Sequence, residues 1–307
     1  MGTHTIVGAG AVGTGTAQAL IERGEQVRVV TRSGGGLDHP AVERVAADAT
    51  DKARMIELAA DCVAIYNCAN PPYHKWTTDW PPLSDSFLAA AEATGARLVT
   101  MSNLYGYPED SSPMKATDPL DPPTKKGAIR VDMWKQALAA HEAGRIQATE
   151  VRASDYFGPG LGDTAHLGDR FVPRVMKGKS ASVLGSTDVK HSWTYIDDVC
   201  ETMAIAGTDE RALGRAWHVP TAEAKTVEEM AAAVAAETGV ATPKVRTLPS
   251  SLIKVAGVFV PVMRELPEMM YQFTNPFVID AADTTATFGV EPTPLDQQVK
   301  ATVDSYR

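Results

Sequence analysis

The chain opens with Thr3-His4-Thr5-Ile6-Val7-Gly8-Ala9-Gly10-Ala11-Val12-Gly13, a β-branched run that leads directly into the pattern Gly-x-Gly-x-x-Gly. A helical pattern follows over residues 14–23. This order of strand, glycine turn and helix is the context in which the glycine pattern indicates dinucleotide binding. We predict that the backbone at the helix N-terminus receives a diphosphate. The residues assigned to it are Gly8, Gly10, Ala11, Val12 and Gly13.

Short apolar runs alternate with helical segments through the first half of the chain. The expected strands are 27–30, 42–45, 63–66, 97–101 and 149–153, and the expected helices are 49–60, 83–94 and 128–143. This alternation predicts an α/β fold with a Rossmann-type, doubly wound parallel sheet.

Residues 102–126 interrupt the alternation with five prolines and no helical or strand period. A long irregular loop of this kind is usually functional, and it leaves the carboxyl end of a strand, where open α/β sheets bind their ligands. We expect a dinucleotide-binding domain over residues 1–157, completed by about 190–220. A smaller, partly discontinuous C-terminal substrate-binding region is expected over residues 158–189 and 221–307. Some of the apolar side chains in 252–277 are expected to line a mostly apolar pocket.

The residues after the second expected strand bear on the choice of coenzyme. An NAD site usually carries a carboxylate about 20 residues after the glycines, where it binds the ribose hydroxyls. Here the place is taken by Arg32, a guanidinium suited to a 2′-phosphate, with the hydroxyls of Thr31 and Ser33 beside it. We therefore expect NADP (NADPH) in preference to NAD. The remaining coenzyme contacts are expected from Asp48, Ala49, Cys68, Ala69 and Asn70.

Composition narrows the class of protein. The 307 residues are 44% hydrophobic and 22% charged, as in an ordinary soluble protein, and the formal net charge of −9 opposes non-specific nucleic-acid binding. The three cysteines and seven histidines show no metal-ligand or disulfide spacing, so we expect no metal and a reducing, cytoplasmic location. The apolar run 255–263 is too short to cross a bilayer, so we expect no membrane association.

Together these features resemble the extended branch of the short-chain dehydrogenase/reductase superfamily, the NAD-dependent epimerase/dehydratase group. The resemblance covers residues 3 to about 220 and includes Leu104-Tyr105-Gly106, Arg152-Ala153-Ser154-Asp155-Tyr156-Phe157-Gly158-Pro159-Gly160 and Trp193-Thr194-Tyr195-Ile196-Asp197-Asp198-Val199. It implies that Asp155 contacts the coenzyme and that the protein forms a homodimer. It also implies a substrate site lined by Asn70, Tyr156, His191 and Trp193.

The chain departs from that family in its catalytic pair. The family's Tyr-x-x-x-Lys is missing, since no tyrosine here is followed four residues later by lysine. In that pair an ammonium next to a phenol favours the phenolate, so that a proton moves near neutral pH. We expect a replacement in which Tyr105 or Tyr107 is the proton donor and Lys126, or else Arg130, supplies the cation. Lys126 would also bind the ribose, and Ser102 would orient the substrate.

Three functions remain open from the sequence. The first is an NADP-dependent oxidoreductase that reduces the carbonyl of a ketone, aldehyde or enone in a small metabolite. The second is an epimerase or dehydratase of a sugar or related metabolite, in which hydride leaves and returns. The third is a regulatory protein that binds NADP without chemistry, which the missing Tyr-x-x-x-Lys favours. We expect the first, because the long loop is retained and no dense Arg/Lys cluster offers donors to a diphosphate-linked sugar.

Overall fold

A computed structural model describes residues 2–249 and 261–307, so that residues 252–260 of the expected apolar pocket lie outside the described residues. The chain divides into two compact units. The first unit comprises Met1–Gly106, Lys125–Arg152 and Val199–Val219. The second unit comprises Tyr107–Thr124, Ala153–Asp198 and Pro220–Arg307.

The first unit is built on a seven-stranded parallel sheet, in the order β11-β7-β5-β4-β1-β2-β3. This confirms the predicted doubly wound α/β fold. The order changes direction next to β1, and sheets of this kind bind ligands at such a switch point, outside the carboxyl ends of the strands. The strands are β1 (Thr3–Val7), β2 (Gln26–Thr31), β3 (Val42–Ala46), β4 (Cys62–Asn67), β5 (Arg97–Ser102), β7 (Ala148–Arg152) and β11 (Ala216–His218).

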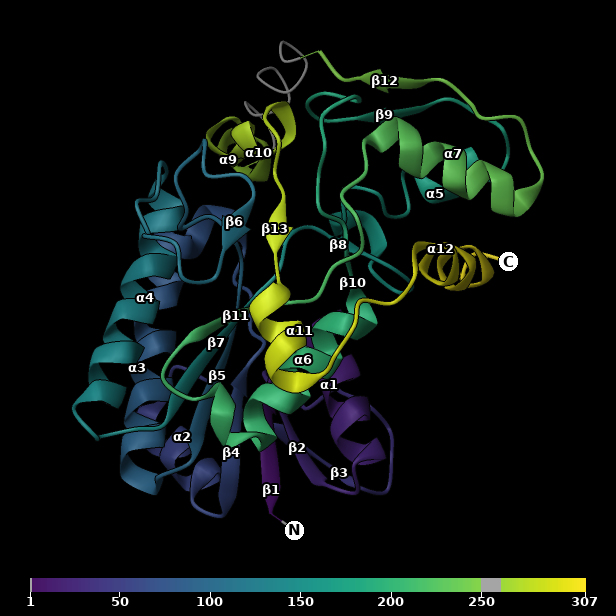
Figure 1. The fold of residues 1–307 in the computed structure, drawn as a ribbon. Helices are drawn as coiled ribbons and strands as arrows, with labels where there is room; N and C mark the ends of the chain where they lie inside the picture. Colours follow the sequence, from purple (N-terminus) through teal and green to yellow (C-terminus); the bar gives the residue numbers. More distant parts are fainter. Residues whose placement is uncertain (1, 250–260) are drawn as a thin grey trace. The chain divides into compact units, whose positions relative to one another are not determined.

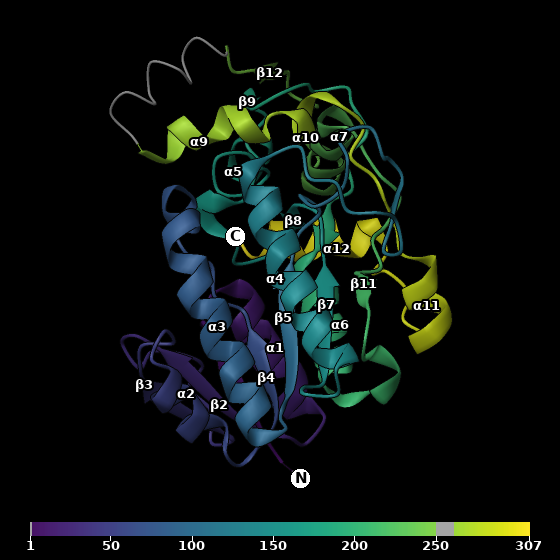
Figure 2. The same cartoon turned by 90° about the vertical axis from the view of Figure 1, so that its left-hand side faces the viewer.

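Helices cover both faces of this sheet (Figures 1 and 2). One face carries α2 (Lys52–Ala59), α3 (Trp76–Thr94) and α4 (Lys125–Glu142), and the other carries α1 (Ala11–Glu22) and α6 (Ile196–Thr208). Strands covered on both sides read as continuous apolar runs, which is why 63–66 was recognisable in the sequence. Two short 3-10 helices, η1 (Tyr73–Lys75) and η3 (Glu210–Ala212), belong to the same unit.

Helix α3 begins earlier than the sequence predicts. We expected it to start at residue 83, after Pro81 and Pro82, but it starts at Trp76 and contains both prolines. A proline in a helix interior costs about 3 kcal/mol, since it removes an amide donor. The indoles of Trp76 and Trp80, one turn apart, are 3% and 1% exposed and meet edge to face at 5.9 Å. We attribute the longer helix to the burial of these two rings, which offsets the lost hydrogen bonds.

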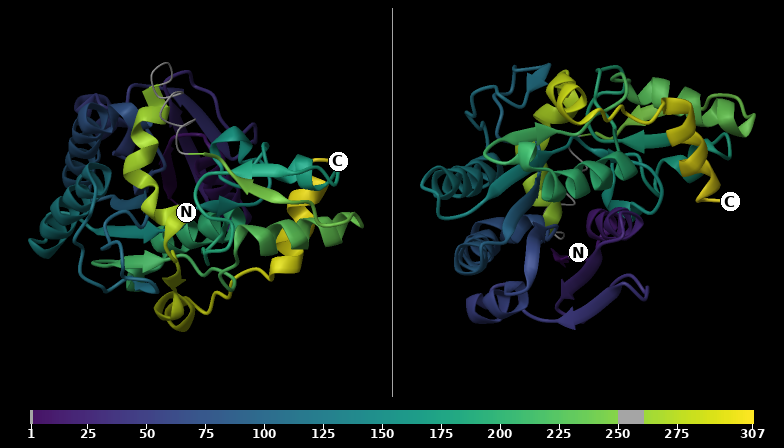
Figure 3. Two further views of the ribbon diagram at one scale, coloured as in Figure 1. Left: turned by 90° about the horizontal axis from the view of Figure 1, so that it is seen from above. Right: turned by 60° about the horizontal axis from the view of Figure 1, so that its bottom comes forward.

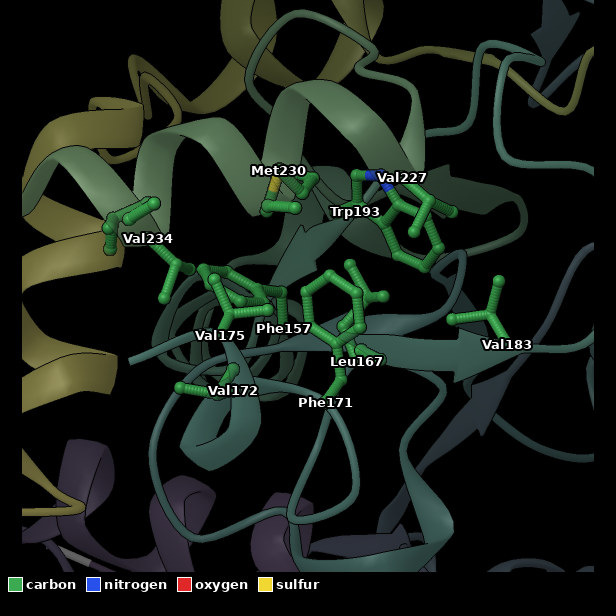
Figure 4. Close-up of a cluster of buried hydrophobic side chains, with 14 of the residues drawn as sticks. Phe157, Leu167, Phe171, Val172, Val175, Val183, Trp193, Val227, Met230 and Val234 are labelled. Carbon is green, nitrogen blue, oxygen red and sulfur yellow. The ribbon is translucent and has the colours of Figure 1, made fainter. Parts of the chain in front are cut away.

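The second unit has a separate hydrophobic core, in which Phe157, Trp193 and Met230 come together (Figure 4). Helices α7 and α12 pack against each other in this unit; Figure 3 shows them in green and yellow near the C-terminus. The helices are α5 (Val172–Val175), α7 (Val227–Thr238), α9 (Pro261–Met269), α10 (Tyr271–Thr274), α11 (Ala282–Phe288), α12 (Leu295–Asp304) and the 3-10 helix η2 (Gly162–Thr164).

Strands in the second unit occur as parallel pairs. They are β6 (Met114–Lys115) with β13 (Ile279–Asp280), β8 (Tyr156–Phe157) with β10 (Thr194–Tyr195), and β9 (Ala181–Val183) with β12 (Val245–Thr247). The loop expected over 102–126 is therefore not wholly irregular, because β6 lies within it. Its side chains also bind the C-terminal segment: Ser112 Oγ accepts a hydrogen bond from the Val278 amide at 3.1 Å. A pairing this short and this distant in sequence leaves no periodic signal.

Candidate functional site

The glycine loop joins β1 to α1 through two positions that only glycine fits. Gly8 has a φ of +104°, and a Cβ there would lie 2.7 Å from the carbonyl oxygen of Cys68. A Cβ on Gly13 would lie 1.9 Å from the carbonyl oxygen of Gly8. Both glycines are therefore needed for the turn to close and for α1 to pack against it.

Gly10 has the opposite environment. Apart from the adjoining residues of the chain, no described atom lies within 4 Å of a Cβ placed on Gly10. Gly10 is also the N-cap of α1, which begins without a side-chain cap. An uncapped helix N-terminus keeps unpaired amides and the positive end of the helix dipole, and both favour a diphosphate.

A pocket of about 490 Å³ adjoins this loop, and we call it the glycine-loop pocket. Its position beside an uncapped helix N-terminus and at the end of β2 fits the diphosphate and adenosine end of a dinucleotide. The residues of the first unit therefore suit the coenzyme that the glycine pattern predicts. The pocket is lined by Ala9, Thr14, Thr31, Ser33, Gly35, Gly36 and Leu37.

The turn after β2 is shaped by residues predicted to hold a 2′-phosphate. The Thr31 hydroxyl donates to the carbonyl oxygen of Gly35 at 2.9 Å, and the Gly35 amide donates to Ser33 Oγ at 3.4 Å. Arg32, between two lining residues, is exposed. Hydrogen bonds from Thr50, with a smaller contribution from the Arg32 charge, lower the pKa of the exposed Asp48 carboxyl. Arg32 is thus an exposed cation between two residues that line the glycine-loop pocket, although it is not itself one of the lining residues.

The residues after β4 lie against the glycine loop. The Cys68 amide donates to the Val7 carbonyl oxygen at 3.0 Å, while burial raises the pKa of the Cys68 thiol. A thiol with a raised pKa stays protonated and is a poor nucleophile, so Cys68 offers no covalent chemistry. Ala69 is half-buried and Asn70 is exposed. The assignment of these three residues to the coenzyme, and of Asn70 to the substrate, stays a prediction.

Ser102 ends β5 beside a buried arginine. The Ser102 hydroxyl accepts a hydrogen bond from Arg130 Nε at 3.3 Å, and Arg130 also donates to the carbonyl oxygen of Met101. The Arg130 guanidinium lies 4.6 Å from the ring centroid of Trp80 and is 5% exposed as a residue. Because its oxygen accepts from Arg130, the hydroxyl hydrogen of Ser102 is directed toward another partner.

Tyr105 and Lys126 are brought to the same place by a residue that the sequence analysis missed. The Tyr105 hydroxyl is hydrogen-bonded to the hydroxyl of Tyr73, in η1. Lys126 is 3% exposed, and its Nζ lies 5.5 Å from the ring centroid of Tyr73. The signal available in the sequence was the aromatic spacing of Tyr73, just before α3, with Trp76 and Trp80 in its first turns.

Tyr107 has a different position from the other predicted catalytic residues. It belongs to the second unit and is 1% exposed, among the largest fully buried side chains of the described residues. Ser102, Tyr105 and Lys126 all belong to the first unit. Of the two tyrosines, Tyr105 is therefore the better candidate for the proton donor.

The second unit holds a buried imidazole–carboxylate pair. His191 Nε2 lies 3.0 Å from Asp155 Oδ2 and 3.3 Å from Ser154 Oγ. His191 Nδ1 lies 3.2 Å from the carbonyl oxygen of Gln272. Burial alone would raise the pKa of the Asp155 carboxyl, but the hydrogen bond and the charge of His191 hold it below its usual value. Both predicted site residues, Asp155 and His191, are thus engaged with each other.

Aromatic rings enclose this pair. His191 packs on Trp193 with ring centroids 4.3 Å apart, and His166 stacks on Phe273 at 4.2 Å. Burial lowers the pKa of His166 to about 4, so the ring is neutral at physiological pH. Among the described residues, no hydrogen-bond partner faces the buried Nε2 of His166. Tyr156, the remaining predicted substrate residue, is half-buried in β8.

The described residues also bear on metal binding and on membrane insertion. In the described ranges, no group of three or more His, Cys, Asp or Glu side chains is arranged to hold a metal ion. Nor does any helix within residues 2–249 or 261–307 combine the length and apolar character needed to span a bilayer. Cys62, Cys68 and Cys200 are all free thiols.

Comparison with known sequences identifies similar proteins. The model of the NAD dependent epimerase/dehydratase family matches residues 5–219. A curated protein of Rhizobium meliloti (strain 1021), named "Probable UDP-glucuronate 4-epimerase", is 25% identical over 216 residues. The alignment covers 68% of this chain and 58% of that protein, so the chain matches less than two thirds of this relative's length.

Comparison with solved structures gives the same fold. The UDP-glucose 4-epimerase of Thermotoga maritima, solved with UDP-glucose, has a TM-score of 0.80 at 18% identity, over 99% of this chain and 98% of that one. The dTDP-glucose 4,6-dehydratase of Bacillus anthracis str. Ames, solved in complex with NAD, has a TM-score of 0.80 at 17% identity, over 100% and 96% of the chains. At such identities the likeness establishes the fold, and activity has to be argued from the site.

Proposed function

The chain belongs to the NAD-dependent epimerase/dehydratase family, enzymes of the short-chain dehydrogenase/reductase type, and from this premise we propose that it epimerises or dehydrates a sugar or related metabolite. The family match and the similar proteins favour this alternative over the net carbonyl reduction expected from the sequence. The observation that carries it is the open backbone at Gly10, between two glycines that the fold requires. It provides a diphosphate cradle at the switch point of the sheet.

A nicotinamide coenzyme supplies a reversible hydride acceptor, which leaves the protein to handle the proton of the substrate hydroxyl. We assign that task to Tyr105, with the hydroxyl hydrogen of Ser102 directed at the substrate oxygen. The ammonium of Lys126 stabilises negative charge on the phenols. Support for this assignment comes from the contacts that join Tyr105 to Tyr73, Tyr73 to Lys126, and Ser102 to Arg130.

The second unit is proposed to take the substrate. The rings of Trp193 and Phe273 suit the apolar face of a sugar ring, and Nε2 of His166 suits one of its hydroxyl groups. Tyr156 is assigned to the same region. The relatives named above act, by their names, on UDP-glucuronate, UDP-glucose and dTDP-glucose, so nucleotide sugars are the first class to test.

For the coenzyme we propose NADP in preference to NAD. Arg32 is exposed and lies in sequence between two residues that line the glycine-loop pocket, and the stretch Thr31-Arg32-Ser33-Gly34-Gly35-Gly36 contains no carboxylate that would repel a 2′-phosphate. A guanidinium binds a phosphate through paired, charge-assisted hydrogen bonds.

A substrate panel tests the proposed reaction. The purified chain is incubated with UDP-glucuronate, UDP-glucose, dTDP-glucose and unlinked hexoses, with NADP⁺ or NAD⁺, and the products are resolved by NMR. An epimerised or dehydrated product with no net change in reduced coenzyme supports the proposal. Net oxidation of NADPH by a simple ketone or aldehyde would restore the reductase. Coenzyme binding without turnover of any panel member would instead indicate the regulatory protein.

A further inference from the structure

We propose that Tyr73 is a second proton-transfer residue, which passes the substrate proton to and from Tyr105. The inference rests on the proposed function and adds to it a residue from a different element of the fold. Helix α4 carries two buried cations one turn apart, Lys126 and Arg130. This helix therefore supplies positive charge rather than a phenol. The two phenols come instead from η1 and from the segment after β5.

The first support is the direct contact between the two hydroxyl groups. The phenol oxygens of Tyr73 and Tyr105 are hydrogen-bonded, and their rings meet edge to face with centroids 6.5 Å apart. Both side chains are half-buried, so each retains some contact with solvent. A hydrogen bond between two hydroxyls provides a path along which one proton moves each way.

The second support is that Trp76 fixes both rings. Trp76 is 3% exposed, and its indole Nε1 donates to the carbonyl oxygen of Pro71 at 2.9 Å. Its ring stacks on Tyr105 with centroids 6.1 Å apart and lies 4.9 Å from the Tyr73 centroid. Proton transfer depends on groups held in position before the reaction, and a buried, hydrogen-bonded indole provides that positioning.

The third support is the position of the cation. Lys126 Nζ lies over the ring of Tyr73, 5.5 Å from its centroid, and Lys126 is 3% exposed. A buried ammonium acts on a neighbouring group through a lower effective dielectric than it would in water. This ammonium therefore stabilises negative charge on Tyr73, and in the proposed relay Tyr105 exchanges the proton with the substrate.

The transfers balance as follows. The substrate hydroxyl proton moves to the oxygen of Tyr105 while the proton of Tyr105 moves to the Tyr73 phenolate. The O–H bonding pair becomes the second bond of the carbonyl, and a nicotinamide coenzyme held at the glycine loop would accept the C–H pair and later give it back. In the return direction both proton transfers run in reverse, so that Tyr73 is ionised again.

Three hydroxyl-deletion variants test this relay: Tyr73→Phe, Tyr105→Phe and the control Tyr306→Phe. The Tyr306 hydroxyl donates to Asp169 in the second unit at 2.6 Å, so its loss reports the effect of deleting a phenol hydrogen bond elsewhere. With the panel substrate that the wild type converts, we expect Tyr73→Phe and Tyr105→Phe each to lower kcat by about 100-fold, with KM and coenzyme Kd nearly unchanged. The control should keep wild-type kcat.

A pH profile separates proton transfer from a structural role. Site-specific replacement of Tyr73 by a fluorinated, more acidic tyrosine should move the pH profile of kcat to lower pH, and the same replacement of Tyr306 should leave it in place. A Tyr73→Phe enzyme with wild-type kcat and pH profile would overturn the relay and leave the proposed function standing. A wild type that converts no panel member would remove the proposed function, and the relay with it.

Discussion

Buried charge has different neighbours in the two candidate sites, one in each unit. In the first unit, Lys126 and Arg130 are buried next to phenol rings, an indole and a serine hydroxyl. In the second unit, the imidazole of His191 is buried against the carboxylate of Asp155, so the charge is compensated within the pair. The first arrangement can stabilise negative charge that develops during a reaction, whereas the second, as we propose, would recognise a ligand by shape and hydrogen bonding.

The backbones of the two units also differ, in the strands that hold the candidate sites. In the first unit, β1 ends in the open glycine turn, and its parallel pairing with β2 holds that turn in place. Backbone amides are thereby positioned for a charged ligand. In the second unit the strands form only short pairs, and rings such as Trp193 and Phe273 make the surroundings of the polar groups. In our proposal, the first unit therefore stabilises charge on the ligands, and the second unit offers them an aromatic contact surface.

The largest effect should come from closing the glycine turn. Gly13→Ala places a methyl group 1.9 Å from the Gly8 carbonyl oxygen, so we expect a loss of roughly 3 kcal/mol or more in unfolding free energy and no measurable coenzyme binding. The matched control is Gly10→Ala, whose methyl group meets no described atom within 4 Å and should leave the melting temperature near that of the wild type. Thermal melts and coenzyme titration check both variants. Equal destabilisation by the two would show that the turn is not the constraint we describe.

The buried cation of the first unit is tested next. Lys126→Met keeps the length of the side chain and removes its charge, so we expect kcat to fall by about 100-fold, because the phenolate loses its stabilising ammonium. Lys125, the preceding residue, is exposed and serves as the control in Lys125→Met, which should keep most of the wild-type kcat. Steady-state kinetics on the converted panel substrate measure both. Similar losses in the two variants would point to a general effect of charge on α4.

A smaller and more selective effect, on coenzyme binding, is expected from Arg32, which lies in sequence between two residues of the glycine-loop pocket. Arg32→Ala should weaken NADPH binding by about 10- to 100-fold and leave NADH nearly unchanged, because only NADPH carries the 2′-phosphate. Arg44, a β3 residue that pairs with Asp38 at 3.1 Å, provides the control Arg44→Ala. Fluorescence titration with both coenzymes is the measurement. An equal loss for NADPH and NADH would contradict the NADP assignment.

The smallest effect concerns the second unit and depends on pH. The imidazole of His166 binds a proton below about 4 in the folded chain, against 6.5 as its ordinary value, because burial lowers its pKa. Between these values the unfolded chain binds more protons, so stability falls as the pH is lowered from 6.5 toward 4. His166→Phe keeps a ring to stack on Phe273 and should recover on the order of 1–3 kcal/mol near the lower pH. Denaturant melts at two pH values check this, and a wild-type pH dependence in the variant would refute it.

The sequence predicted the parts of the molecule that local patterns encode. The glycine spacing, the alternation of strand and helix and the cation at the start of α4 follow from short periodic stretches. The predicted start of α3 was wrong because the helix extends back through the burial of Trp76 and Trp80, which depends on the folded sheet. Tyr73 was missed for the same reason: it meets Tyr105 across 32 residues of sequence, and no periodic pattern links them. Contacts of that kind exist only after folding.

The last strand of the sheet has a consequence for how the protein is made. β11 pairs with β7 through Ala216↔Glu150, Trp217↔Val151 and His218↔Arg152. It follows β7 in the chain by more than sixty residues, which belong mainly to the second unit. During synthesis β7 therefore waits on the ribosome as an unpaired edge, open to association with other nascent chains. A fragment that stops before residue 216 lacks β11 and keeps β7 as an edge, so a C-terminal truncation at the end of β7 removes part of the first unit.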